Sequence, residues 1–197
     1  MITHTNALPP QHMEHFFRTV EHMEGWNSLL KPLAVCPVII QWCQWETKPY
    51  RGTPTELVLP LSFMYIHCTF QPSQPCLSFQ QCSANMRAMQ HFHQDDRGWD
   101  DIGYSFMVGL DGYIYEGHGW QWRGAHTKGH NSRGYGISLI RDYTADLPAR
   151  HALELWRGRM TATLTMHGHW QLVNTSCPGD ALYSEIQGWE HFREVQP

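Results

Sequence analysis

The sequence predicts an α/β fold in which a central, mostly mixed β-sheet is flanked by about three helices. The chain has 197 residues, of which 42% are hydrophobic and 16% charged, and this suits one globular domain with a sizeable core. Short apolar runs typical of buried strands alternate with segments of helical periodicity. Such alternation favours a sheet packed with helices.

The first part of the chain differs from the rest. Residues 12–23 have only weak helical periodicity and follow two prolines. We expect residues 1–35 to form an N-terminal arm, or the end of an upstream region, and residues 36–197 to form the domain.

The predicted domain begins with a strand and a helix joined by a loop. Residues 57–66 end in an apolar run that predicts a buried strand stopping at His67. Residues 71–82 contain two prolines and are expected to form a loop. Residues 83–93 repeat apolar side chains at helical spacing, which predicts a helix.

A hairpin, one more strand and two helices follow. Asp111 and Gly112 form a turn dipeptide between the strands expected at residues 104–109 and 113–116. The remaining elements are a buried strand at 136–140 and helices at 147–157 and 178–189.

Composition and charge exclude several functions. The net charge is −4 with histidine neutral, and no run of lysine and arginine occurs, so no nucleic-acid partner is expected. No stretch of about 18 apolar residues is present, so no membrane span is expected. The first residues lack the charged and apolar regions of a signal peptide. The protein therefore either stays inside the cell or is a piece of a longer precursor.

Three residues are candidates for a catalytic metal site. The chain has 14 histidines, and histidine is the commonest metal ligand. Cys177 directly precedes Pro178, which suits the first turn of a helix, and a cysteine at a helix N-terminus favours the thiolate that binds metal. His169 is near enough in sequence for a loop to join it to Cys177, and His67 ends a buried strand, where sites gather in α/β sheets. Two histidines and one cysteine are a known catalytic zinc set.

Other interpretations of these residues stay open. A lone histidine at a strand end is usually just hydrogen-bonded, and a lone cysteine is usually a small hydrophobic residue. Two further histidine pairs are chelate-like. His91 and His93 fall in a predicted helix, where positions two apart do not face each other, whereas His167 and His169 could share one strand face.

Four motifs carry a resemblance to a known family. They are DIGYSFMVG at 101–109, DGYIYEGHGW at 111–120, GAHTKGHNSR at 124–133 and CPGDAL at 177–182. Through them the chain resembles the animal peptidoglycan-recognition proteins, and among these the long, secreted N-acetylmuramoyl-L-alanine amidase form. The resemblance runs from about residue 36 to residue 192 and implies a single amidase or recognition domain.

The resemblance implies a Zn²⁺ site at the same three residues. The ligands fall on His67 in the triplet His-Cys-Thr, on His169 in Gly-His-Trp-Gln, and on Cys177. The family pattern has a second histidine in place of Cys68, which we expect to be buried and reduced, and an arginine in place of Trp170. Members without amidase activity typically carry another residue at the position of Cys177, so its retention argues for an enzyme.

The resemblance also implies catalytic residues beside the zinc. The catalytic tyrosine falls on Tyr104, which by itself would be interpreted as a core aromatic, and the supporting threonine or lysine falls on Thr175. Zinc lowers the pKa of bound water and polarises the substrate carbonyl, and both side chains would hydrogen-bond the water or the developing oxyanion. The substrate would be the lactyl amide between N-acetylmuramic acid and L-alanine in bacterial peptidoglycan.

A groove above the zinc holds the stem peptide in the family. Thr69 and His126 fall on groove positions. Trp122 and Arg141 match positions that in some members favour diaminopimelate, with the arginine pairing with its extra carboxylate. Arg141 equally fits a solvated charge at a strand end.

The remaining cysteines concern disulfide pairing and the cellular compartment that it implies. Cys76 and Cys82 match the family's short disulfide, which implies an oxidising compartment and hence a secreted, extracellular protein. Cys36 matches a bridging cysteine whose usual partner lies in a segment, about residues 149–166, that is shorter here and holds no cysteine. Cys36 is left to pair with Cys43 or to stay free.

Two functions compete at this point. The retained ligands and Tyr104 favour a zinc amidase that trims bacterial cell wall in innate immunity. The shortened segment before His169, which we expect to alter the approach to that ligand, and the Trp170 change favour a recognition protein that binds peptidoglycan without cutting it. The groove motifs disfavour a third possibility, a structural zinc or thiol protein with no cell-wall ligand.

Overall fold

Six strands form one mixed sheet in the computed structural model, which describes residues 38–157 and 164–195. The strand order is β1-β4-β3-β5-β2-β6, and every neighbouring pair is parallel except β3 and β4. The strands are β1 (Ile39–Ile40), β2 (Phe63–Cys68), β3 (Phe106–Val108), β4 (Ile114–Glu116), β5 (Gly134–Leu139) and β6 (Thr165–Gly168). The predicted α/β class and mixed sheet are confirmed.

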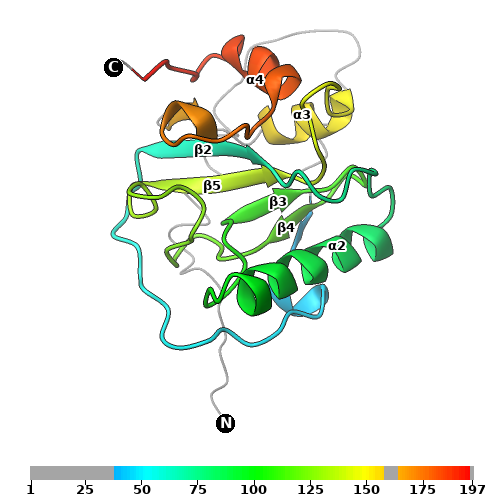
Figure 1. Ribbon diagram of the computed structural model, residues 1–197, viewed down its shortest axis with the longest axis vertical. Helices are drawn as coiled ribbons and strands as arrows, with labels where there is room; N and C mark the ends of the chain where they lie inside the picture. Colours follow the sequence, from blue (N-terminus) through cyan, green and yellow to red (C-terminus); the bar gives the residue numbers. More distant parts are fainter. Residues whose placement is uncertain (1–37, 158–163, 196–197) are drawn as a thin grey trace, which may run out of the picture. The chain divides into compact units, whose positions relative to one another are not determined.

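Helices cover both faces of this sheet (Figure 1). Helix α2 (Phe79–His91) lies on one face, and α3 (Arg150–Arg157) and α4 (Asp180–Gln187) lie on the other. Side chains alternate between the two faces along each strand. Phe106 therefore belongs to the core under α3 and α4, and its neighbour Met107 to the core under α2.

Strand β2 lies inside the sheet, between β5 and β6. Five of its six residues are buried, as the apolar run predicts. The prediction placed its start too early, because Pro60 has no N–H to donate to a sheet ladder. The strand also continues one residue past His67, to Cys68.

The predicted hairpin is confirmed at β3 and β4. The two strands pair antiparallel, with Val108 opposite Ile114. Gly112 in the connecting turn has φ of 89°, which glycine adopts without steric cost. Tyr104 lies just before β3 rather than within the strand, where the sequence placed it.

Strand β6 was not predicted, since the sequence showed only a short apolar stretch before His169. It is a four-residue strand at one edge of the sheet and pairs in parallel with β2. Because the pairing is parallel, the C-terminal ends of β2 and β6 lie side by side.

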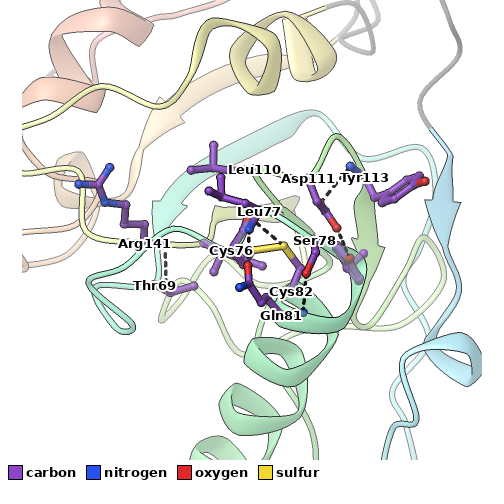
Figure 2. Close-up of a disulfide and its surroundings, with 12 residues drawn as sticks. Thr69, Cys76, Leu77, Ser78, Gln81, Cys82, Leu110, Asp111, Tyr113 and Arg141 are labelled. Carbon is purple, nitrogen blue, oxygen red and sulfur yellow. Dashed lines mark hydrogen bonds between the residues drawn. A yellow bond between two sulfur atoms is a disulfide. The ribbon is translucent and has the colours of Figure 1, made fainter.

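Helix α2 begins at Phe79, four residues earlier than the prediction, so the end of the expected loop is helical. Ser78 caps it by accepting a hydrogen bond from the N–H of Gln81 at 3.3 Å. The predicted disulfide between Cys76 and Cys82 is present and ties the preceding loop to the first turn (Figure 2). After His91 the helix widens into a π-helical turn, η2 (Phe92–Asp96).

Helix α4 begins later than predicted, at Asp180, with Gly179 as its N-cap. Gly179 has φ of 92°, and a Cβ there would come within 2.5 Å of the Tyr143 backbone. The chain thus turns at Gly179, and Pro178 is not in the first helical turn. Cys177 stands further from the helix than the sequence argument assumed.

The remaining expectations concern the arm, one cysteine pair and the membrane. The arm and Cys36 lie outside the described residues. The pairing of Cys36 therefore stays a prediction. Cys43 is an exposed free thiol, and Cys68 is buried and free as expected. Within residues 38–157 and 164–195, no helix combines the length and the apolar character that crossing a bilayer requires.

Candidate metal centre

His67, His169 and Cys177 converge at the common end of β2 and β6. His67 is near the end of β2, His169 is the first residue of the short 3-10 helix η3 (His169–Gln171), and Cys177 lies in the loop before α4. Their ligand atoms all lie within 4.8 Å of one another. In the described part of the chain, no other group of three or more histidine, cysteine or acidic side chains meets this criterion.

The distances within the group are short. The Sγ of Cys177 is 3.7 Å from Nδ1 of His67, and the two imidazole rings are 4.2 Å apart between centroids. The shortened segment before His169 therefore does not move this residue away from the other two. The β2–β6 pairing sets its position instead.

Backbone hydrogen bonds hold the loop that carries Cys177. The N–H of Trp170 donates to the carbonyl oxygen of Cys177 at 2.9 Å, and the N–H of Cys177 donates to Oγ1 of Thr175 at 3.2 Å. The N–H of Cys68 donates to the Sγ of Cys177, also at 3.2 Å. The Trp170 ring packs on Tyr183, away from this sulfur's hydrogen bonds, with ring centroids 4.4 Å apart.

Burial keeps both histidines neutral. It lowers the pKa of His67 well below its usual range and lowers the pKa of His169 to about 4. Nδ1 of His169 is buried and has no hydrogen-bond partner. Contact with the Cys68 thiol, together with burial, raises the pKa of Cys177. The group offers two neutral imidazoles and a thiol whose proton a metal would displace.

The alternative histidine pairs are engaged elsewhere. His91 is exposed and forms an ion pair with Asp95. Nδ1 of His93 accepts a hydrogen bond from the Gly103 N–H at 3.0 Å. Nδ1 of His167 donates to the Arg193 carbonyl oxygen at 2.8 Å. His167 therefore does not join His169 in a chelate, as the strand-face argument allowed.

A cavity of about 650 Å³ opens beside the three candidate ligands. Its wall includes His169 and Cys177 together with the predicted Tyr104 and Thr175. Another part of the wall comes from the end of α2, from η2 and from the residues that follow η2, none of which the sequence had assigned to the site. The residues of this wall include Met89, Phe92, His93, Arg97 and Trp99.

Tyr104 is placed to act as a neutral hydrogen-bond donor. Its ring centroid is 5.2 Å from that of His67. Burial, and then negative charge at Cys177, raise the pKa of Tyr104. The phenol therefore keeps its proton at neutral pH.

The predicted groove residues divide into two sets. Thr69 and His126 line the cavity, but Trp122 and Arg141 are not among its described lining residues. Trp122 bridges to Glu56 in an isolated antiparallel contact. Arg141 donates its backbone N–H to Thr69 at 2.9 Å (Figure 2), while its guanidinium binds the Ser73 carbonyl oxygen and Asp146.

Comparison with known families and proteins gives consistent matches. Residues 58–180 match the family model described as N-acetylmuramoyl-L-alanine amidase. The chain is 53% identical over 173 residues to the N-acetylmuramoyl-L-alanine amidase of Sus scrofa, covering 82% of this chain and 29% of that protein. It is 39% identical to peptidoglycan-recognition protein LB of Drosophila melanogaster, covering 69% of this chain and 62% of that protein. The chain thus spans less than a third of the length of its mammalian relative.

Solved structures match over nearly their whole length. Peptidoglycan recognition protein LE in complex with tracheal cytotoxin, a monomeric diaminopimelic acid-type peptidoglycan, superposes with a TM-score of 0.76 at 36% identity. The match covers 80% of this chain and 96% of that one. Drosophila peptidoglycan-recognition protein LB gives the same TM-score at 34% identity, covering 81% and 98%.

Proposed function

The chain belongs to the N-acetylmuramoyl-L-alanine amidase family and to the peptidoglycan-recognition proteins, and we propose that it is a zinc-dependent amidase. The proposed reaction is hydrolysis of the amide between N-acetylmuramic acid and L-alanine in bacterial peptidoglycan. The observation that carries this proposal is the convergence of His67, His169 and Cys177 beside a cavity whose wall includes the last two residues.

The donor set fits zinc. Two imidazoles and one thiolate, with a fourth position free for water or substrate, are a known arrangement in catalytic zinc sites. The unpartnered Nδ1 of His169 and the position of Nδ1 of His67 beside the sulfur support this fit. Zinc bound here would polarise the substrate carbonyl and lower the pKa of bound water.

The chain's own residues supply orientation and hydrogen bonds. Tyr104, neutral and close to His67, would donate to the oxygen that gains negative charge as the amide is attacked. The hydroxyl of Thr175 accepts from the Cys177 N–H and can donate its own proton into the cavity. Thr69 and His126 would contact the substrate from the cavity wall.

The substrate class follows from the relatives. A related recognition protein binds a diaminopimelic acid-type peptidoglycan fragment, and we propose a muropeptide of this type as the ligand here. Trp122 and Arg141 stay proposed contacts to the diaminopimelate, and Arg141 would have to leave Ser73 and Asp146 to reach it. We also propose that the protein is secreted and acts in innate immunity, in line with the Cys76–Cys82 disulfide.

A second function, binding without cleavage, is supported by a different observation. Several relatives of this chain are named as recognition proteins, among them recognition protein SA of Drosophila melanogaster at 35% identity. The presence of all three ligands together with Tyr104 favours the amidase over this alternative.

The two functions can be separated with defined muropeptides. The zinc-loaded protein is incubated with a diaminopimelate-type and a lysine-type muropeptide, and free stem peptide is measured by mass spectrometry. We expect release of the stem peptide from at least the diaminopimelate type. Zinc bound at one equivalent with no product from either muropeptide would refute the amidase and leave the binding protein.

Cysteine variants control for the ligand assignment. Cys177→Ser removes the proposed thiolate ligand, and we expect it to abolish product formation and weaken zinc binding. Cys43→Ser changes an exposed free thiol and is expected to keep full activity. Activity that survives in Cys177→Ser would refute the assignment of this ligand.

A further inference from the structure

A fully buried threonine hydroxyl connects His67 to a second buried histidine. Oγ1 of Thr127 lies 3.3 Å from Nε2 of His67 and 3.0 Å from Nδ1 of His126. The backbone of Thr127 is fixed in turn, because its N–H donates to Oδ1 of Asn131 at 2.7 Å. The residue comes from the loop between β4 and β5, which the metal-ligand argument did not use.

The protonation of the two imidazole rings restricts the direction of the hydrogen bonds that this hydroxyl forms with them. Both rings are buried against each other, and an imidazole that binds a metal is neutral, so each ring carries one N–H. The hydroxyl has one hydrogen to donate. Accepting from both rings would leave that hydrogen without an acceptor, because the two imidazoles are the described hydrogen-bond partners of Oγ1. Two arrangements satisfy the hydroxyl: the hydrogen bonds run either from His67 through Thr127 to His126, or in the reverse direction.

The position of the sulfur selects between the two directions. Nδ1 of His67 is the nitrogen that faces Cys177, at 3.7 Å, so it must be unprotonated to bind a metal there. Nε2 of His67 then carries the hydrogen and donates to Thr127, and Thr127 donates to Nδ1 of His126. The single ring hydrogen of His126 is then carried by its other nitrogen, Nε2.

Close packing against β5 fixes the ring of His126. Its ring lies directly against β5, where a Cβ on Gly136 would come within 2.2 Å of the ring, so only glycine allows this approach. Nε2 of His126 is buried and has no hydrogen-bond partner among the described residues.

We propose that Thr127 is a positioning residue for the metal ligand His67, which it orients and holds in the tautomer that presents Nδ1 to the metal. Partners of this kind fix the ring of a ligating histidine and typically change metal affinity by roughly 10- to 100-fold when removed. The inference deepens the proposed function and rests on the zinc site that this function requires.

The test measures zinc affinity rather than hydrolysis. Metal-free wild type, Thr127→Val and Thr127→Ser compete for zinc with a chromophoric chelator. Valine keeps the shape of the side chain without the hydroxyl, and we expect zinc binding weaker by roughly 10- to 100-fold. Serine restores the hydroxyl, and its affinity is expected within a few-fold of wild type.

A second measurement does not depend on how the valine variant folds. In wild type with ¹⁵N-labelled histidine, two-bond nitrogen–proton correlations report the tautomers of both rings. We expect hydrogen on Nε2 of both His67 and His126 with zinc bound. Hydrogen on Nδ1 of His126, or wild-type zinc affinity in Thr127→Val, would overturn the proposal. Tight zinc binding without stem-peptide release would instead refute the amidase and leave the role of Thr127 intact.

Discussion

The disulfide and the proposed metal centre both use cysteine, but they depend on very different lengths of chain. Cys76 and Cys82 are six residues apart and join a loop to the first turn of the helix that follows it (Figure 2). Cys177 meets His67 across 110 residues, and only because β2 and β6 pair side by side. The first site is local, whereas the second exists only once the sheet has formed.

The surroundings of the sulfur atoms differ in the same way. Both disulfide cysteines are completely enclosed in the core under α2. Cys177 is half-buried and lines the cavity, within reach of a metal and of substrate. From this difference we expect the disulfide to contribute to stability and the proposed metal centre to contribute chemistry, and we expect that each role can be removed without the other.

The largest expected effect is on the chemistry. Tyr104→Phe removes the phenol hydrogen that would stabilise the developing oxyanion, and we expect kcat on muropeptides to fall by roughly 100- to 1,000-fold. Zinc affinity and thermal stability should stay close to wild type, because the ring and its packing are retained. Unchanged kcat in this variant would show that the tyrosine is only part of the core.

Acidification is expected to have the largest effect on stability. Burial lowers the pKa of His93 and of His118 to about 4, and that of His126 to about 3. In the unfolded chain these groups titrate near 6.5, so the unfolded state binds more protons below that pH. For the metal-free protein, we therefore expect no loss of unfolding free energy from these histidines above pH 6.5. Between pH 6.5 and pH 4, the free energy of unfolding should fall by roughly 1 kcal/mol per histidine per pH unit.

Thermal denaturation of the zinc-free protein at pH 7 and pH 5 measures this loss. His91→Gln is a control, because His91 is exposed and its removal should leave the loss unchanged. A melting temperature that is the same at the two pH values would contradict the prediction.

The smallest expected effect comes from the disulfide. Its loop is short, so the double variant Cys76→Ser with Cys82→Ser should lose about 2 kcal/mol of stability. For a domain of this size, that corresponds to a fall of roughly 4 to 8 °C in melting temperature. Zinc affinity and the pH dependence should be unchanged. A large loss of zinc affinity would show that the local cross-link and the metal centre are coupled after all.

Features set by neighbouring residues could be predicted from the sequence. The Asp111–Gly112 turn predicted the hairpin because its strands follow each other directly. The apolar run ending at His67 predicted a buried strand, and the family motifs implied the disulfide and the ligand residues. Residue types and spacing were sufficient for these features, since each depends on a short segment or on a motif.

Features set by contacts between distant segments required the tertiary structure. β6 is a four-residue edge strand without a sequence pattern of its own, and its pairing with β2 places His169 beside His67. The guanidinium of Arg141 binds Ser73 and Asp146, which no motif indicates.

The sequence by itself therefore determined the fold class, the hairpin and which residues are candidate metal ligands. Only the tertiary structure decided that these residues meet, which nitrogen of His67 faces Cys177, and that Thr127 stands behind it. The physical reason is that a ligand needs the right chemical type, which its identity supplies, and also a position and a tautomer. Those come from packing and hydrogen bonds contributed by strands and loops far apart in the chain.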